Sequence, residues 1–153
     1  MKIIKNKFIP FGCYKTINLL GLVFTKSDLS DEDKNHEGIH SVQMLECAVV
    51  LAILTLIIIL LFNISAWWIL ISPLAFYAWY GIEYLLIRVL NLKDKQNDCY
   101  HDVSFEEEAH NNDDNLEYLE TRKWFSWLEY IKIGSYKGRS EERRVGKECR
   151  SRW

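Results

Sequence analysis

The hydrophobic pattern divides the chain into a polar N-terminal part, a very apolar middle and a polar C-terminal part. Between residues 47 and 92, Glu83 and Arg88 are the only charged residues. Such a stretch is typical of a segment that contacts the hydrocarbon core of a membrane rather than water. Glu83 lies near the polar end of the stretch, where an interfacial or paired carboxylate is the expected form.

Two apolar segments, residues 47–62 and 66–88, are separated by the polar turn Asn63-Ile-Ser65. The continuous apolar part of each is slightly shorter than the roughly 20 residues that a helix needs to cross a bilayer. We predict an apolar hairpin of two transmembrane helices, with a thin or re-entrant hairpin as the alternative.

The segments that flank the hairpin have patterns of their own. Residues 3–9 and 17–25 are rich in β-branched and aromatic residues, and the turn signals between them predict a short N-terminal β-hairpin, with paired strands as the alternative. Ser30 and Asp33 resemble a capping box, which predicts a helix that begins near Asp31 and continues into the first apolar segment. The fold class predicted is therefore a mainly α membrane protein.

The polar C-terminal part contains two further helix signals. Ser104 with Glu107 forms a second potential capping box, which predicts a helix through His110. Apolar residues then recur at helical spacing from about Asn115 to Ile131, which predicts an amphipathic helix.

The positive charges around the hairpin predict its orientation. Lys34 precedes the first apolar segment and Arg88, Lys93 and Lys95 lie at or beyond the end of the second, whereas the turn between them carries no charge. Because short cytoplasmic flanks are enriched in Lys and Arg, we predict a multi-pass protein of a bacterial inner membrane with both termini in the cytoplasm.

The last fifteen residues differ in character from the rest of the chain. Residues 139–153 begin with Arg-Ser-Glu-Glu-Arg-Arg, which is the translation of AGATCGGAAGAGCGTCGT and resembles a sequencing adapter. We interpret them as a non-native tail, with a genuine basic tail as the alternative, and residues 1–138 as a single domain. Without the tail the chain has 13 basic and 18 acidic residues, a balance that argues against a nucleic acid as partner.

The candidate chemistry begins with an HExxH motif on the first predicted helix. His36 and His40 are four residues apart, so their imidazoles lie on one helix face and can share one Zn²⁺, with Glu37 beside them as the catalytic base. A third ligand is needed to complete such a site. Gln43, three residues beyond His40, can face this site and support the ligands, or it can be a solvated polar residue.

A second motif supplies candidates for the third ligand. The run Glu106-Glu-Glu-Ala-His110 resembles the E-x-x-A-D helix of the CAAX-prenyl-protease group of membrane gluzincins. This resemblance implies that Glu106 is the third metal ligand, with Glu108 as the alternative. It also places His110 where the group has Asp, so that His110 would replace the supporting carboxylate. His101 is a reserve ligand or a solvated loop residue.

The chain as a whole resembles an uncharacterised family of small Bacteroidetes membrane proteins. The resemblance covers about residues 8–130 and rests on the HExxHxxQ motif, the FExEA motif beginning at Phe105, and the segments around residues 9–12, 79–83 and 122–125. It implies a common site pattern and no particular substrate.

Together these features predict a zinc metallopeptidase that hydrolyses peptide bonds of a polypeptide substrate near the cytoplasmic surface of the lipid bilayer. The alternative is a non-catalytic, membrane-anchored interaction protein with a structural or vestigial zinc site. A closed shell of four protein ligands favours that alternative, and an open coordination position favours the enzyme.

Overall fold

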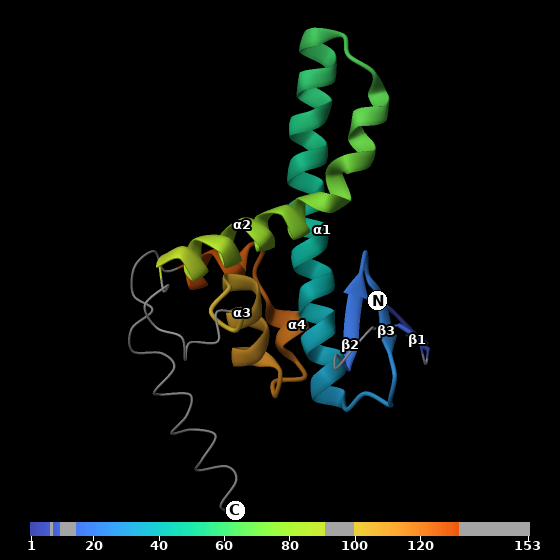
Figure 1. The fold of residues 1–153 in the computed structure, drawn as a ribbon, viewed down its shortest axis with the longest axis vertical. Coiled ribbons are helices and arrows are strands. Elements are labelled where there is room, and N and C mark those ends of the chain that lie inside the picture. Colours follow the sequence, from blue (N-terminus) through green and yellow to red (C-terminus); the bar gives the residue numbers. More distant parts are fainter. Residues whose placement is uncertain (7, 10–14, 91–99, 132–153) are drawn as a thin grey trace, which may run out of the picture.

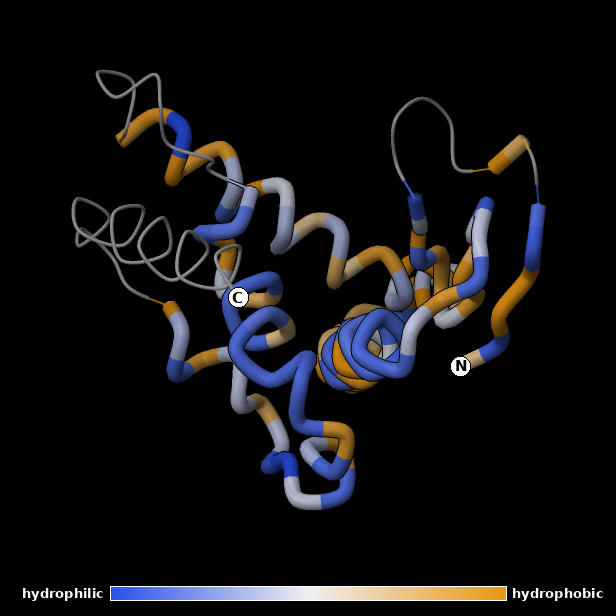
Figure 2. Tube along the Cα trace, turned by 90° about the horizontal axis from the view of Figure 1, so that it is seen from below, coloured by the Kyte–Doolittle hydropathy of each residue, from blue (hydrophilic) through white to orange (hydrophobic). Residues whose placement is uncertain are grey.

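One long helix, α1 (Asp31–Phe62), is the element around which the others are arranged in the computed structural model (Figure 1). The small sheet lies on one side of α1 and the C-terminal helices lie on the other, as Figure 2 shows from the polar end of the helix. The structure describes residues 1–6, 8–9, 15–90 and 100–131, so the predicted tail lies outside the described residues.

The predicted start of α1 is confirmed. The Ser30 hydroxyl oxygen accepts a hydrogen bond from the backbone N–H of Asp33 at 3.0 Å, and the Asp33 carboxylate accepts one from the backbone N–H of Ser30 at 3.0 Å. This capping box satisfies two N–H groups that a helix start would otherwise leave open. The helix then continues through the whole first apolar segment and ends at Asn63, whose φ of 49° is left-handed.

The N-terminal strands form a sheet with a different pairing from the predicted one. The strands are β1 (Lys2–Lys5), β2 (Thr16–Leu19) and β3 (Leu22–Thr25), in the order β1-β3-β2. A hairpin joins β2 to β3, so residues 17–25, which were predicted as one strand, supply most of both strands. β1 pairs with β3 in parallel. Leu20 and Gly21 both have positive φ, as a tight two-residue turn requires, and this turn signal inside the second predicted strand was missed.

The second apolar segment is not one straight helix. It consists of the 3₁₀ helix η1 (Ala66–Leu74), which runs back along the upper part of α1, and the α-helix α2 (Ala75–Leu90), which turns away from α1 (Figure 1). Pro73, which has no N–H to donate, lies just before this change of direction. The predicted pair of antiparallel helices is therefore formed by α1 and the nine residues of η1, and α2 departs from it.

α2 turns away because one of its faces is part of the core. Buried side chains of α2 pack with residues of α1, α3 and the C-terminal segment below the apolar column; the core residues are Met44, Phe76, Ile87, Val103, Phe105 and Trp127. The Phe76 and Phe105 ring centroids lie 4.6 Å apart. This aromatic contact fixes α2 above the helix that carries Glu106.

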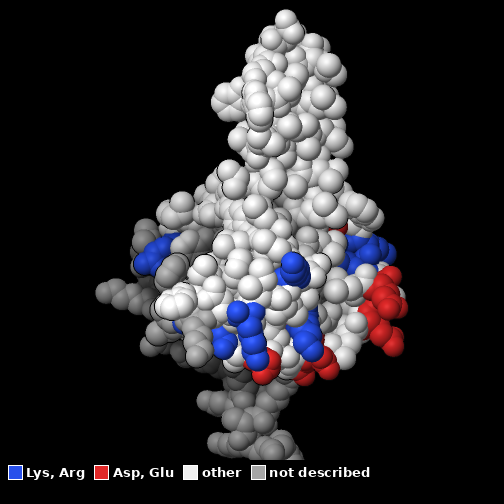
Figure 3. Space-filling view, turned by 90° about the vertical axis from the view of Figure 1, so that its right-hand side faces the viewer, with Lys and Arg blue, Asp and Glu red and all other residues white. Residues whose placement is uncertain are grey.

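The upper half of α1 and η1 project from the body as an apolar column, residues 47–74. Only 11% of the most apolar 18-residue window of α1 is buried, so this part is not a core helix. Figure 3 shows that the charged side chains on the visible face gather on the body and leave the column free of charge. Both α1 and the η1–α2 segment are long and apolar enough to cross a membrane.

Helix α3 (Ser104–Asn112) begins at the predicted residue, but a side chain of α2 accepts the hydrogen bond of its first N–H group. The Glu83 carboxylate accepts hydrogen bonds from the backbone N–H of Ser104 at 2.9 Å and from its hydroxyl at 2.7 Å. The predicted capping box of Ser104 and Glu107 is therefore wrong, because Ser104 is already the first helical residue. Glu83 is paired, as one of its two sequence interpretations proposed.

The C-terminal part does not form the predicted amphipathic helix from Asn115 to Ile131. It forms two short helices, α4 (Tyr118–Thr121) and the 3₁₀ helix η2 (Ser126–Tyr130). Between them Arg122 leaves the helical conformation, with φ −59° and ψ 132°, and its side chain enters the interior. A tertiary ion pair thus overrides the local helical pattern.

The ion pairs of Arg122 connect the C-terminal part to the body. Its guanidinium donates hydrogen bonds to Glu46 of α1 at 2.5 and 3.1 Å and to Glu108 of α3 at 2.6 and 3.2 Å. The three side chains are at most 3% exposed. Buried charges of this kind are tolerated only when they compensate one another.

The first prediction concerns this network. Replacement of Arg122 by Ala would leave the Glu46 and Glu108 carboxylates buried without their cation, so we expect the free energy of unfolding to fall by about 3–5 kcal/mol. Denaturant unfolding in detergent micelles measures this difference. Lys123→Ala, at the exposed neighbouring position, is the matched control and should change the free energy by less than about 0.5 kcal/mol. Equal effects of the two substitutions would contradict the assigned role.

Candidate metal centre

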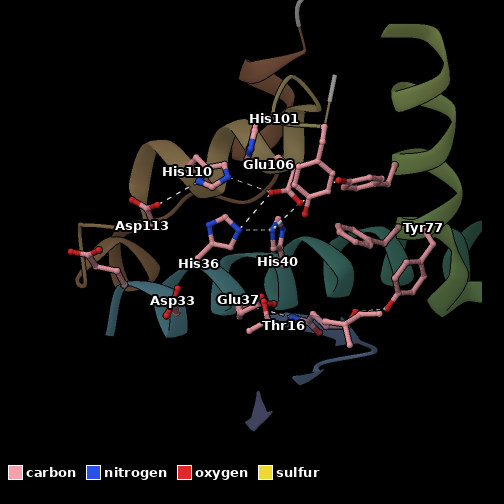
Figure 4. Close-up of a pocket in the computed structure, with 16 residues that line it drawn as sticks. Thr16, Asp33, His36, Glu37, His40, Tyr77, His101, Glu106, His110 and Asp113 are labelled. Atoms are coloured by element: carbon pink, nitrogen blue, oxygen red, sulfur yellow. Dashed lines mark hydrogen bonds and ion pairs between the residues drawn. The ribbon is translucent and has the colours of Figure 1, made fainter. Parts of the chain in front are cut away.

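Two histidines of α1 and one glutamate of α3 meet at one point (Figure 4). The Nε2 atoms of His36 and His40 lie 3.1 Å apart. The Glu106 carboxylate lies opposite them, with Oε1 at 3.4 Å from the His40 Nε2 atom and Oε2 at 3.6 Å from the His36 Nε2 atom. The structure therefore brings the three residues that the sequence singled out to within reach of one ion.

These distances fit a tetrahedral metal site. Ligand atoms about 2.0–2.1 Å from a zinc ion in tetrahedral geometry are separated from one another by about 3.3 Å. The two Nε2 atoms are 3.1 Å apart, and each faces a different oxygen of Glu106, at 3.4 Å for His40 and 3.6 Å for His36, which is close to this spacing. Within the described part of the chain, the buried Oε2 atom of Glu106 has no hydrogen-bond partner. A buried carboxylate oxygen without a donor is costly unless a cation binds it, so the residues fit a metal ion.

Gln43 holds the His40 ring in the orientation that a metal ligand needs. Its side-chain NH₂ donates to the Phe105 carbonyl at 3.1 Å and to the Glu108 carboxylate at 2.8 Å, which leaves its Oε1 as an acceptor. This Oε1 lies 2.8 Å from the His40 Nδ1 atom. The proton of neutral His40 is therefore on Nδ1, and the Nε2 lone pair faces Glu106. Gln43 faces the site and is fully buried.

The electrostatics of the centre couple His40 to Glu106. Burial lowers the pKa of His40, but the Glu106 charge and hydrogen bonds to Glu106 and Gln43 outweigh burial and raise it to about 9. Burial likewise raises the pKa of Glu106, but His40 and hydrogen bonds to the two histidines hold it well below its usual range. Without a metal the centre therefore contains a carboxylate and a bound proton, which a cation would displace.

His110 adjoins the centre from α3. Its Nε2 atom lies 3.8 Å from Glu106 Oε2, and its Nδ1 atom lies 3.5 Å from the Asp113 carboxylate. Burial, together with the neighbouring charges of His36 and His101, lowers the pKa of His110 to about 4. The ring is therefore neutral at physiological pH and stands beside Glu106, where the sequence placed a supporting group.

Glu108, the alternative third ligand, lies away from the histidine pair. Its carboxylate accepts hydrogen bonds from Arg122, from the Gln43 amide and, at 2.9 Å, from the Tyr118 hydroxyl. Residues 106 and 108 are two positions apart on α3 and so point to different sides of the helix. Its contacts support Gln43 rather than the metal point.

A cavity of about 530 Å³ opens beside the three converging residues. Glu37 lines this cavity together with Thr16 and Asn18 of β2, and Figure 4 shows it below the two imidazoles. The Glu37 side chain is largely buried, and its backbone carbonyl accepts hydrogen bonds from Asn18 and Ser41. The centre thus has an accessible side, with a carboxylate at its edge.

The sequence interpretation missed several residues that shape the centre. The Tyr80 hydroxyl donates to Glu106 Oε1 at 3.3 Å, and Tyr100 also hydrogen-bonds to this carboxylate. No motif marks Tyr80, which lies in the second apolar segment, or Tyr100. A Cβ at Gly38 would lie 2.8 Å from the Leu119 side chain, so the glycine inside the HExxH motif allows α4 to pack closely on α1.

Comparison with known proteins places no further constraint on this centre. No protein-family model, curated protein or solved structure matches the chain. The interpretation of the centre therefore rests on the positions and chemistry of its own residues.

The second prediction concerns the pH dependence of the metal-free protein. The pKa of His40 is about 9 in the folded chain, against about 6.5 when unfolded. Between these values only the folded state binds the proton, so the free energy of unfolding should decrease as the pH rises, by a total on the order of 3 kcal/mol. Denaturant unfolding in a chelator from pH 6 to pH 10 measures this slope.

Glu106→Gln provides the control for this prediction. The substitution removes the negative charge that retains the His40 proton, so the slope between pH 6.5 and 9 should largely disappear. A wild-type protein whose stability in chelator does not change over this interval would contradict the coupling of His40 to Glu106.

Proposed function

We propose that this protein is a zinc-dependent metallopeptidase that cleaves polypeptides at the cytoplasmic surface of a bacterial inner membrane. The observation that supports this most strongly is the convergence of His36, His40 and Glu106 beside an open cavity. Two imidazoles and one carboxylate form a donor set that zinc peptidases use, with a coordination position left open for water or substrate.

The donor set also favours the enzyme over the non-catalytic alternative. A structural zinc site has four protein ligands, whereas three converge here and the cavity adjoins them. A bound Zn²⁺ would supply Lewis-acid polarisation of the scissile carbonyl and a lowered pKa for water. We also propose that the chain is related to membrane gluzincins and to the family of small Bacteroidetes membrane proteins that it resembles.

Residues around the metal point supply the proton transfer and hold the ligands in place in the proposed mechanism. Glu37 at the edge of the cavity accepts the proton of the attacking water and transfers it to the leaving amine. Gln43 keeps the His40 Nε2 lone pair directed at the metal point. Tyr80 and Tyr100 bind Glu106 and hold its carboxylate in place.

The apolar column determines where this chemistry takes place. Residues 47–62 of α1 extend over about 24 Å at 1.5 Å per residue, which is close to the thickness of a hydrocarbon core. The metal point lies between α3 and the part of α1 that precedes the column. We propose that the column inserts into the bilayer as a hairpin from the cytoplasmic side, so that both termini and the site remain in the cytoplasm.

The third prediction tests catalysis. Glu37→Gln retains the size of the side chain but removes its basicity, so we expect kcat/KM for peptide cleavage to fall by about 10²–10⁴-fold while zinc affinity is retained. Cleavage of a mixed peptide library by purified zinc-loaded protein in detergent measures the loss. Glu32→Gln is the matched control, because Glu32 lines the same cavity five residues earlier on α1 and is exposed.

Two results would contradict the peptidase proposal. One is cleavage by Glu37→Gln at the wild-type rate, which would exclude Glu37 as the base. The other is a zinc-loaded wild-type protein that cleaves no member of the library, which would favour the membrane-anchored interaction protein.

The fourth prediction tests the membrane column. Lysines at both Leu54 and Ile57, which are exposed in the middle of the column, should each cost about 2.5–3.5 kcal/mol on insertion. We expect the double variant to be lost from the membrane fraction after an alkaline wash. Leu116→Lys with Leu128→Lys, two exposed leucines of the body, is the control and should remain in the membrane. Identical fractionation of both variants would contradict insertion.

A further inference from the structure

All four histidines of the chain line one cavity. His36 and His40 belong to the centre described above, and His101 and His110 complete the row. The neighbouring ring centroids, from His40 to His36, His110 and His101, are 4.7, 4.6 and 4.6 Å apart. A single zinc ion with Glu106 would use only the first two of these rings.

The Glu106 carboxylate lies between the two pairs of histidines. Its Oε1 atom is 3.4 Å from the His40 Nε2 atom, whereas its Oε2 atom is 3.6 Å from the His36 Nε2 atom and 3.8 Å from the His110 Nε2 atom. Among the described residues no hydrogen-bond donor reaches this buried Oε2 atom, and the side chain is 4% exposed. The unpartnered Oε2 atom thus lies between one ring of each pair, where a cation on the side of the second pair would also satisfy it.

We propose that His101 and His110 bind a second divalent transition-metal ion, most simply a second Zn²⁺, with Glu106 as a bridging ligand. Ligand atoms of these three residues all lie within 4.8 Å of one another. Two imidazoles and a carboxylate oxygen suit zinc and similar ions rather than calcium or magnesium. This inference rests on the proposed function, because Glu106 is shared with the first ion.

Asp113 prepares His110 for this role. Its carboxylate lies 3.5 Å from the His110 Nδ1 atom, where it favours the proton on that nitrogen and leaves Nε2 as the ligand atom facing Glu106. This repeats on α3 the relation between Gln43 and His40 on α1. A second possible set, His36 with His110 and Asp113, would remove His36 from the first ion and is therefore an alternative that the experiment must separate.

A pair of ions would change the chemistry of the proposed peptidase. In two-metal hydrolases the ions share a bridging carboxylate and lie about 3.5–4 Å apart, so that both the attacking and the departing atoms are stabilised. His110 is more exposed than either ligand of the first pair, with 34% of its side chain exposed against 17% for His36 and 9% for His40. We therefore expect the second ion to bind more weakly than the first.

The experiment counts zinc ions in the purified full chain. Protein in detergent is stripped with a chelator, titrated with Zn²⁺ at equilibrium and assayed for bound metal by mass spectrometry. We expect two ions per wild-type chain, the second at least tenfold weaker, and one ion in His101→Ala and in His110→Ala. Asn111→Ala, a substitution at the exposed position next to His110, is the control and should retain two ions.

Each possible result decides the matter. One ion in the wild-type chain, unchanged in His110→Ala, would overturn the second site and leave the first intact, whereas no ion would overturn both. Two ions in His101→Ala with one in Asp113→Ala would overturn the proposed ligand set in favour of the His36 set. His110→Gln retains polarity and volume, so loss of one ion in this variant with an unchanged circular-dichroism spectrum would separate ligation from folding and support the proposal.

Discussion

The buried guanidinium of Arg122 is the contact on which the centre depends. It pairs with Glu46 of α1 and with Glu108 of α3. The Glu108 carboxylate also accepts a hydrogen bond from the Gln43 amide, and the side-chain oxygen of Gln43 in turn hydrogen-bonds to the His40 ring. An unbroken series of charged and polar contacts thus runs from the C-terminal part to a candidate metal ligand. Each member is satisfied only when α1, α3 and the segment after α4 are all in place.

Helix α1 belongs to two parts of the molecule that need different residues, the apolar column and the polar body. The upper half of this helix is exposed and apolar, while its lower half carries buried polar residues, among them Asn35, Gln43 and Glu46. Buried polar groups need partners, and α3, the loop after α3 and the segment after α4 supply them. The site is therefore built immediately below the column, on the same helix, which keeps the distance between the two nearly fixed.

Local sequence patterns determined the elements whose signals act over a few residues. The capping box at Ser30, the start of α1 and the convergence of residues 36 and 40 on one face follow from contacts within one or two helical turns. The choice of Glu106 from three successive glutamates came from a motif resemblance, and the structure places that carboxylate beside both imidazoles. Helix periodicity alone would not distinguish it from its neighbours.

The tertiary structure decided the features that depend on distant partners. η1 and α2 diverge because α2 buries one face against α3, so a pattern that reads as one apolar span becomes two elements. The predicted last helix is interrupted because Arg122 finds two buried carboxylates that lie far from it in sequence. Gln43 had an equally plausible solvated interpretation until its neighbours were known. Sequence by itself therefore determined the local helices and the candidate ligands, whereas only long-range packing, which a local pattern does not encode, fixed what each side chain faces.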